Sequence, residues 1–328
     1  MTNRRAFLTA CAFGLLAAPM GAAAAQQPRR TGRVGWVAIG LARSSVFLET
    51  FREGMREHGW TEGQNLTLAT RAVERVDQDR IAELTRELVG LNVDVIVALG
   101  PAVYGVRNGA GPVPVVFATS GDPVEAKLVA SLAHPGGSLT GMTFLSLELA
   151  GKRLELLREA FPSISRVAIL ANPAHAGEQA ELRESQAAAR RLALSVQYLP
   201  VRAATDFDTA FDAITRERAE ALLAFPDALI TSQQQVIADF AAKRRIPTIS
   251  GWAEFAEVGN LMTYGPNLRD SYRRVAIFVD KILRGARPAD LPVERPTRFE
   301  LVLNLKTAAM LGITLPQSIL VRADRVIQ

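Results

Sequence analysis

The chain has 328 residues and 48% of them are hydrophobic, which supports a substantial core and exceeds the size of one average domain. Its formal net charge is +5 and the basic residues are scattered, so neither a nucleic-acid-binding face nor a nucleic-acid partner is predicted. Two globular lobes are therefore expected.

An export signal is predicted at the start of the chain. Arg4 and Arg5 precede the apolar stretch 6–20, and a run of small residues ends at Ala25, where we expect cleavage. The stretch is short for a bilayer span, which needs roughly 20 apolar residues. The paired arginines fit a twin-arginine signal and fit a general secretory signal equally well. Either route leads to a periplasmic protein.

Cleavage would change both the charge and the thiol content. Losing Arg4 and Arg5 leaves 36 basic against 33 acidic residues, a net charge of +3. It also removes Cys11, the only cysteine, so the mature chain would have no disulfide and no cysteine nucleophile. Residues 8–11 look like a lipoprotein cleavage box, but the apolar run follows the cysteine, which argues against lipidation.

The first half after the signal alternates apolar runs with helical patterns. Residues 34–39, 93–99 and 113–118 are continuous apolar runs, as in parallel strands buried on both faces. Helices are indicated between these runs by apolar residues at steps of three or four, namely Phe47, Phe51, Met55, Ile81, Leu84, Leu88 and Leu91. Such strand, helix, strand units build an open parallel sheet flanked by helices.

The same pattern begins again after Pro162. Strands are predicted at 167–170, 196–199, 221–225 and 246–249. A helix through Phe207, Phe211 and Ile214 is predicted to begin with a capping box at residues 205–208. A second parallel-sheet lobe follows from this repetition.

The C-terminal part contains one long helical pattern, which ends at Gly285, and one strand at 299–303. Neither can bury itself, so both must pack on the two lobes. The predicted fold is α/β, with two Rossmann-like lobes of parallel sheets flanked by helices and joined by a three-crossing hinge. The expected first lobe is 33–141 with 267–290, the second is 145–260 with 298–328, and the crossings lie near 139–144, 261–266 and 291–297.

Short motifs in a fixed order along the chain are similar to one family. They include 51–54 (FREG), 121–124 (GDPV), 134–141 (HPGGSLTG), 152–157 (KRLELL) and 296–301 (PTRFEL). In order and coverage they resemble bacterial ABC transporter substrate-binding proteins of the tryptophan/tyrosine-type group, which have the type I periplasmic-binding fold.

The resemblance implies two lobes that close by hinge motion on a small polar ligand, an amino acid or related compound. It also implies delivery to a membrane permease driven by an ATPase, and receptors of this type are commonly monomeric. One departure concerns residues 40–45, which differ from the loop expected in an aromatic amino acid binder. Arg43 there fits either an acidic group on the ligand or a solvated loop, and we favour the solvated loop.

Ligand-binding residues are expected just after the strands, because loops and helix N-termini converge at the carboxyl ends of a parallel sheet. Helix N-termini can hold a carboxylate, whereas an ammonium group needs an acidic side chain. The candidates are Ser44, Gly100, Pro101, Thr119, Ser120, Asp122, Asn172, Asp227, Ser250, Trp252 and Tyr264.

Several candidates have a structural alternative. Asp122 precedes Pro123 and has Glu125 three residues later, so we favour an N-cap of a helix beginning at Pro123, with Thr119 and Ser120 as better ligand contacts. Asp227 needs no such role if the next helix begins at Ser232. Asn172 could bind a zwitterion or form an Asx-turn, and Trp252 and Tyr264 could form an aromatic wall or belong to the core.

An enzyme finds little support in the sequence. The three histidines, His58, His134 and His175, have no metal-ligand spacing, and there is no nucleophile elbow, dinucleotide fingerprint or phosphate loop. We expect no catalytic residue, no metal and no cofactor. The alternatives to an ABC importer receptor are a soluble receptor for a chemosensory partner and, less favoured, an exported enzyme.

Overall fold

The computed structural model describes residues 31–145 and 147–328, with the backbone alone for residues 41–45. The predicted signal, its cleavage site and Cys11 lie outside the described residues. The first sheet has five parallel strands in the order β2-β1-β3-β4-β5. These strands are β1 (Gly32–Ile39), β2 (Leu66–Val73), β3 (Val95–Leu99), β4 (Val115–Thr119) and β5 (Leu139–Thr143).

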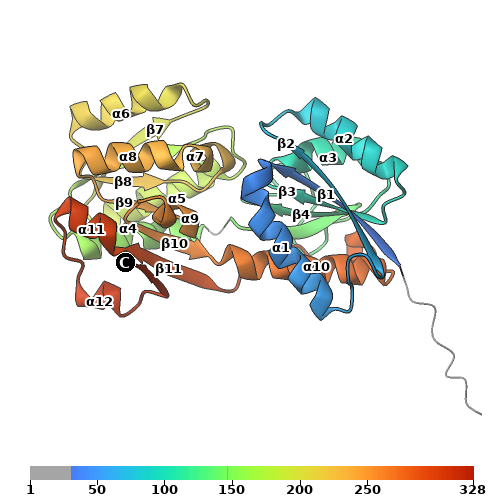
Figure 1. Cartoon of the computed structure of the whole chain (residues 1–328). Helices are drawn as coiled ribbons and strands as arrows, with labels where there is room; N and C mark the ends of the chain where they lie inside the picture. Colours follow the sequence, from blue (N-terminus) through green and yellow to red (C-terminus); the bar gives the residue numbers. More distant parts are fainter. Residues whose placement is uncertain (1–30, 146) are drawn as a thin grey trace, which may run out of the picture. The chain divides into compact units, whose positions relative to one another are not determined.

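Helices cover both faces of this sheet, as Figure 1 shows. They are α1 (Leu41–Glu57), α2 (Gln78–Gly90), α3 (Ala102–Gly109) and α10 (Leu268–Leu283). One apolar cluster joins Trp36 of the sheet to α1 and α10, and another joins Val37 to α2 and α3. Neighbouring residues of β1 thus point to opposite faces, which explains why its sequence is apolar without alternation. We call this sheet with its four helices the first lobe.

The second sheet has seven strands in the order β12-β11-β10-β9-β8-β6-β7. They are β6 (Arg166–Ala171), β7 (Ser195–Pro200), β8 (Ala221–Ala224), β9 (Thr248–Ser250), β10 (Met262–Pro266), β11 (Phe299–Asn304) and β12 (Arg325–Ile327). The pairing of β10 with β11 is antiparallel, and the other pairings in this sheet are parallel. The sheet is therefore mixed at one end.

Helices also cover the second sheet, and we call the whole the second lobe (Figure 1). They are α4 (Glu148–Ala160), α5 (Glu178–Arg191), α6 (Asp206–Glu217), α7 (Ala228–Ser232), α8 (Gln234–Arg244), α9 (Ala253–Glu257), α11 (Leu305–Leu311) and α12 (Gln317–Leu320). Separate apolar clusters form on the α4 and α5 face and on the α6 and α8 face. Among the residues that the structure describes, no helix is long and apolar enough to cross a membrane.

The chain passes between the lobes after β5, between β10 and α10, and in the segment that follows the short 3-10 helix η1 (Pro288–Asp290). Glu294 exchanges backbone hydrogen bonds with Gly141 and Thr143, so the first and third passages run side by side. The amide of Asn267 donates to the carbonyl of Arg298, which joins the second passage to the third. Contacts unite residues 31–328 in one unit, and the proposed domain boundaries and hinge motion stay a prediction.

Two local predictions are wrong. A loop was expected at residues 40–45, but helix α1 already begins at Leu41. Only Gly40, with φ 73°, lies outside the helix. The capping box at Thr205 is not formed. Thr205 has helical backbone angles, and the carboxylate of Asp206 instead accepts from the amides of Arg202 and Ala203.

Gly141 makes the closest backbone approach beside the first passage. It has φ 143°, and a Cβ atom there would lie 2.0 Å from the carbonyl oxygen of Phe117 in the neighbouring strand β4. A side chain at this position would therefore separate two buried strands that are paired in register.

We expect Gly141→Ala to lower the free energy of unfolding by more than about 3 kcal/mol, since it combines strain with a buried clash. Urea denaturation measures the effect. Gly90→Ala is the control, because Gly90 has no atom within 4 Å of its Cβ position and lies in a helix. The control should change stability by less than about 1 kcal/mol, and equal losses in the two variants would contradict the argument.

Candidate functional site

The sequence-predicted candidates lie at the carboxyl ends of neighbouring strands. In the first lobe, Gly100 and Pro101 follow β3, and Thr119 ends β4. In the second lobe, Asn172 follows β6, Asp227 follows β8, and Ser250 ends β9. Since β3 pairs with β4, and β6, β8 and β9 are adjacent, each group shares one edge of its sheet. Ser44 lies in α1, but its side chain is outside the described part.

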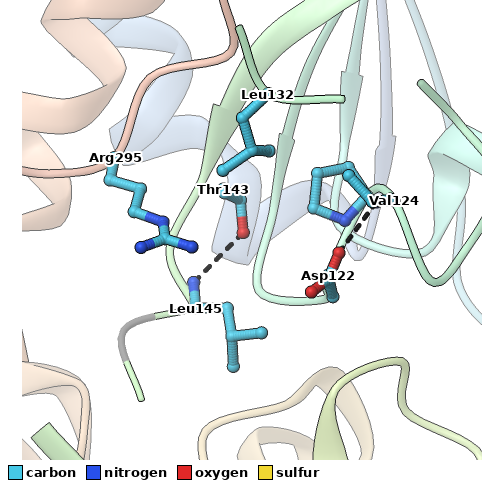
Figure 2. Close-up of a pocket in the computed structure, with 7 residues that line it drawn as sticks. Asp122, Val124, Leu132, Thr143, Leu145 and Arg295 are labelled. Atoms are coloured by element: carbon cyan, nitrogen blue, oxygen red, sulfur yellow. Dashed lines mark hydrogen bonds between the residues drawn. The ribbon is translucent and has the colours of Figure 1, made fainter. Parts of the chain in front are cut away.

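Asp122 caps a turn. Its Oδ1 accepts from the amides of Val124 at 2.8 Å and Glu125 at 3.1 Å, and Figure 2 shows the first of these bonds. The predicted capping role is confirmed, but the predicted helix is wrong, since residues 123–127 form only a turn. The amide of Asp122 donates to the carbonyl of Ala176 at 3.0 Å, which joins the two lobes at this point.

The hydroxyl groups of Thr119 and Ser120 differ in their burial and in their hydrogen-bond partners. The Thr119 hydroxyl is buried and accepts from the amide of Gly121 at 3.2 Å. The Ser120 hydroxyl shares a hydrogen bond of 2.9 Å with Nε2 of His175, which lies in the second lobe. In the sequence His175 is an isolated histidine, and no local pattern indicates its contact with the first lobe.

Asn172 and Asp227 are hydrogen-bonded to each other at the ends of β6 and β8. The Asn172 Oδ1 also accepts from the amide of Ala174 at 3.0 Å, so the Asx-turn is confirmed. Asp227 is 3% exposed and caps helix α7, with Oδ1 accepting from the amide of Ile230 at 2.6 Å. The prediction that Asp227 has no cap to make is therefore wrong, because the helix begins at Ala228 and not at Ser232.

Burial raises the pKa of Asp227 to about 6, although bonds from Ile230, Asn172 and Leu229 oppose the rise. The buried carboxyl therefore binds a proton more readily in the folded than in the unfolded chain. Its contribution to stability is fully present at low pH and is lost as the pH rises from about 4 to about 6. A cation beside Asp227 would favour the charged form, which makes this position attractive for an ammonium group.

Other candidates contribute backbone groups or internal bonds. Ser250 is buried and donates from Oγ to the carbonyl of Ala224 at 2.8 Å. Gly100 has φ 53°, which supports its tight turn between β3 and α3. Pro101 precedes helix α3, and its carbonyl accepts from the Gln78 side chain at 3.1 Å.

Trp252 and Tyr264 have different surroundings. Trp252 packs against an apolar cluster of the first lobe and against one of the second, so its ring touches both. Its indole nitrogen is buried and has no hydrogen-bond partner among the described residues. Tyr264 lies in β10 and packs on the core of the second lobe alone. Trp252 is therefore the better placed of the two for a ligand between the lobes.

Sequence reasoning missed a buried ion pair beneath these strand ends. Arg153 of α4 and Glu181 of α5 are 2% and 4% exposed, and their N–O distance is 2.7 Å. Arg153 Nε also donates to the carbonyl of Tyr264 at 2.9 Å. A Cβ atom on Gly251 would lie 2.7 Å from the Arg153 guanidinium, which places this group directly below the turn after β9.

More carboxyl groups than cationic groups lie around the Arg153 and Glu181 pair among the described residues. Burial raises the pKa of Glu181 and lowers the pKa of Arg153, and Asp227 and Glu178 raise the pKa of Glu181 further. Glu178 is 2% exposed, and its Oε1 accepts from the hydroxyl of Tyr198 at 2.8 Å. Its Oε2 is buried without a partner among the described residues. Asp227 and Glu178 therefore act on the same carboxyl group that pairs with Arg153.

A cavity of about 180 Å³ lies beside the first and third passages (Figure 2). Its walls include Asp122, Leu132, Thr143, Leu145 and Arg295. Of the sequence-predicted candidates it contains only Asp122. Within residues 31–145 and 147–328, no group of three or more His, Cys, Asp or Glu residues could hold a metal ion.

Comparisons with known proteins agree with this architecture. Residues 45–327 match the family model described as ABC transporter substrate binding protein. A tyrosine-binding protein of Clostridioides difficile (strain R20291) is 22% identical over 265 residues, which cover 80% of this chain and 75% of that protein.

Two solved structures are also similar. An ABC domain in complex with L-Trp from Streptococcus pneumoniae has a TM-score of 0.83 and 25% identity, over 90% of this chain and 100% of that chain. A ligand-free, open structure of a substrate-binding protein with adhesive properties from Clostridium difficile has a TM-score of 0.70 and 19% identity, over 91% and 100%. The second likeness shows the fold alone.

Two α/β lobes of this kind, each with polar groups at its strand ends, have the type I periplasmic-binding fold. The chain belongs to the ABC transporter substrate binding protein family. Members of this family are extracytoplasmic and non-catalytic, and they bind a small-molecule ligand for an ABC transporter.

We expect Arg153→Met to lower the free energy of unfolding by about 3–5 kcal/mol, since it leaves the Glu181 carboxylate buried without its cation. The loss should shrink as the pH falls, because Glu181 takes up a proton more readily when folded. Urea unfolding at pH 7.5 and pH 5.5 measures both effects. The double variant Arg153→Met with Glu181→Leu should recover most of the loss, and a double variant as unstable as the single one would contradict this.

Proposed function

We propose that this protein is the solute receptor of an ABC importer and binds an amino acid between its two lobes by hinge closure. The observation that carries the proposal is the buried carboxyl of Asp227 at the end of β8, whose pKa is raised to about 6 by burial. A ligand ammonium beside it would favour the charged form, and Asn172, bonded to Asp227, would orient the carboxyl.

An aromatic amino acid is the ligand that the relatives favour. One relative is named for binding tyrosine and another was solved with L-Trp. In this chain Trp252 touches apolar clusters of both lobes, and its buried indole N–H has no acceptor in the described part of the chain. An aromatic side chain against Trp252, with its ammonium near Asp227, would satisfy both groups.

The remaining parts of the proposal concern export and partners. The family is extracytoplasmic, and we propose a periplasmic location after cleavage at Ala25, through either the twin-arginine or the general secretory route. The partners proposed are a permease with its ATPase subunits, and the receptor acts as a monomer. N-terminal sequencing of the exported protein would locate the cleavage site.

A thermal-shift screen tests the ligand class. At 100 times its Kd, a ligand stabilises the folded chain by about 2.7 kcal/mol, which raises Tm by several degrees. L-Trp and L-Tyr should raise Tm more than other amino acids, small carboxylates, amines or nucleosides. Indole-3-propionate, which lacks the ammonium group, should give no shift. If it shifted Tm as much as L-Trp, the role of Asp227 would be refuted; if another class alone gave a shift, the aromatic assignment would be refuted.

Asp227→Asn separates the charge of this residue from its capping role. The amide oxygen of asparagine can still accept from Ile230, so the folded state should be at least as stable at pH 7.5. The shift with L-Trp, or with whichever amino acid the screen finds, should be lost because the ammonium has no carboxylate to contact.

The matched control is Asp77→Asn, since Asp77 caps helix α2 in the same way through the amide of Arg80. This variant should keep the full ligand shift. An unchanged shift in Asp227→Asn would remove Asp227 from the binding site, whereas a lost shift in both variants would show that the effect is not specific to Asp227.

A further inference from the structure

The two lobes meet in a small contact between the turn after β4 and the turn after β6. Ser120 Oγ and His175 Nε2 are 2.9 Å apart, and the amide of Asp122 donates to the carbonyl of Ala176 at 3.0 Å. Each bond joins the first lobe to the second, so neither can be made by one lobe alone.

Gly177 allows the turns to approach this closely. It has φ 90°, and a Cβ atom there would lie 2.6 Å from the Leu145 side chain and 3.4 Å from Cβ of Asp122. Ala176 and His175 lie 3.4 Å and 3.7 Å from the Cβ position of Gly121 on the other turn, which is ordinary contact distance. The turns are thus in van der Waals contact, and the two hydrogen bonds lie within a closely packed surface.

We infer that His175 and Ser120 form a closure contact, in which the neutral imidazole stabilises the closed arrangement of the lobes and so helps to set the affinity for ligand. This inference rests on the proposed hinge closure. A hydrogen bond is lost once its heavy atoms separate beyond roughly 3.5 Å, so a small rotation of one lobe breaks the contact.

The contact gives closure a pH dependence with a defined sign. Burial lowers the pKa of His175 to about 4, and the smaller effect of Glu125 opposes this. The other charged groups nearby are engaged elsewhere, Asp122 with the amides of its own turn and Glu178 with Tyr198. An opened lobe returns the ring to water, where the pKa of histidine is about 6.5. Opening therefore takes up a proton, and closure weakens as the pH falls below about 6.5.

The size of the effect follows from the two pKa values. If the ring were fully hydrated in the open form, the ratio of closed to open molecules would fall about 30-fold between pH 7.5 and pH 5. His175 as a residue is only partly buried even in contact, so we expect a fall of about 3-fold to 30-fold.

The experiment measures closure in the ligand-free protein, so its outcome does not depend on which ligand the receptor binds. Spin labels are attached at Arg86→Cys in α2 and Asp212→Cys in α6, which are exposed positions in the first and second lobes. Cys11, the only native cysteine, is replaced by serine. Pulsed electron paramagnetic resonance then gives the populations at the shorter and longer distances at pH 7.5 and pH 5.

In the parent chain the shorter-distance population should fall at pH 5. In His175→Gln it should stay constant, because glutamine can bond to Ser120 but does not titrate. His134→Gln, which replaces an exposed histidine of the first lobe, should behave like the parent. No change in the parent, or the same change in His175→Gln, would overturn the inference.

Ser120→Ala provides a second test that leaves the histidine in place. Removing the hydroxyl should lower the shorter-distance population at pH 7.5 by about 2-fold to 10-fold, the range expected for one hydrogen bond. A population equal to that of the parent would also overturn the inference. If the lobes close but neither variant alters closure, the proposed hinge function survives and only the contact is refuted.

Discussion

The need to satisfy buried polar groups at the strand ends determines how this site is built. A parallel sheet covered on both faces leaves its binding edge between apolar layers, so each polar group there must find a partner within the protein. Asp227 meets this need with the amide of Ile230 and the side chain of Asn172. Arg153 meets it with Glu181 and the Tyr264 carbonyl. The groups that find no partner among the described residues, such as the Trp252 indole N–H and Glu178 Oε2, are the ones a ligand or water can still engage.

The buried pair of Arg153 and Glu181 also constrains the backbone of the turn after β9. Gly251 can pass over the Arg153 guanidinium only because it has no side chain, and Gly265 approaches so closely that a Cβ atom there would lie 1.7 Å from the Gly251 carbonyl oxygen. The turn after β9 is therefore held between an ion pair and the neighbouring strand. Trp252 follows this turn directly, so its position depends on groups that are remote from it in sequence.

Much of the fold could be predicted, because most strands are continuous apolar runs and most helices have regular apolar spacing. Strands β2 and β5 were not predicted, and each omission has a physical reason. β2 lies at the edge of its sheet and carries exposed polar residues. β5 contains Thr140 and Thr143, which are buried because their hydroxyls donate to the carbonyls of Leu291 and Gly121. Such partners are distant in sequence, and local patterns cannot reveal them.

The candidate site was predictable to a similar degree. The strand-end rule selected Ser120, Asn172 and Asp227, and capping chemistry identified the turn at Asp122. Helix α7 has only five residues, too short for apolar periodicity to indicate, so the cap at Asp227 was missed. Arg153 and His175 were missed because their importance lies in partners from other elements.

The energetics of closure place a limit on any contact between the lobes. A receptor that is to respond to its ligand must be nearly balanced between open and closed forms, since a ligand shifts this balance only by its preference for one of them. Two neutral hydrogen bonds contribute about 1–3 kcal/mol together, which is comparable with the stabilisation that a ligand supplies near saturation. A charged pair at this contact would have to lose its hydration on every closure, which offsets much of its attraction and makes it a poor device for a nearly balanced equilibrium. The buried pair of Arg153 and Glu181 lies within the second lobe, between α4 and α5, while the Ser120 and Asp122 turn meets its partner through a neutral ring and a backbone amide.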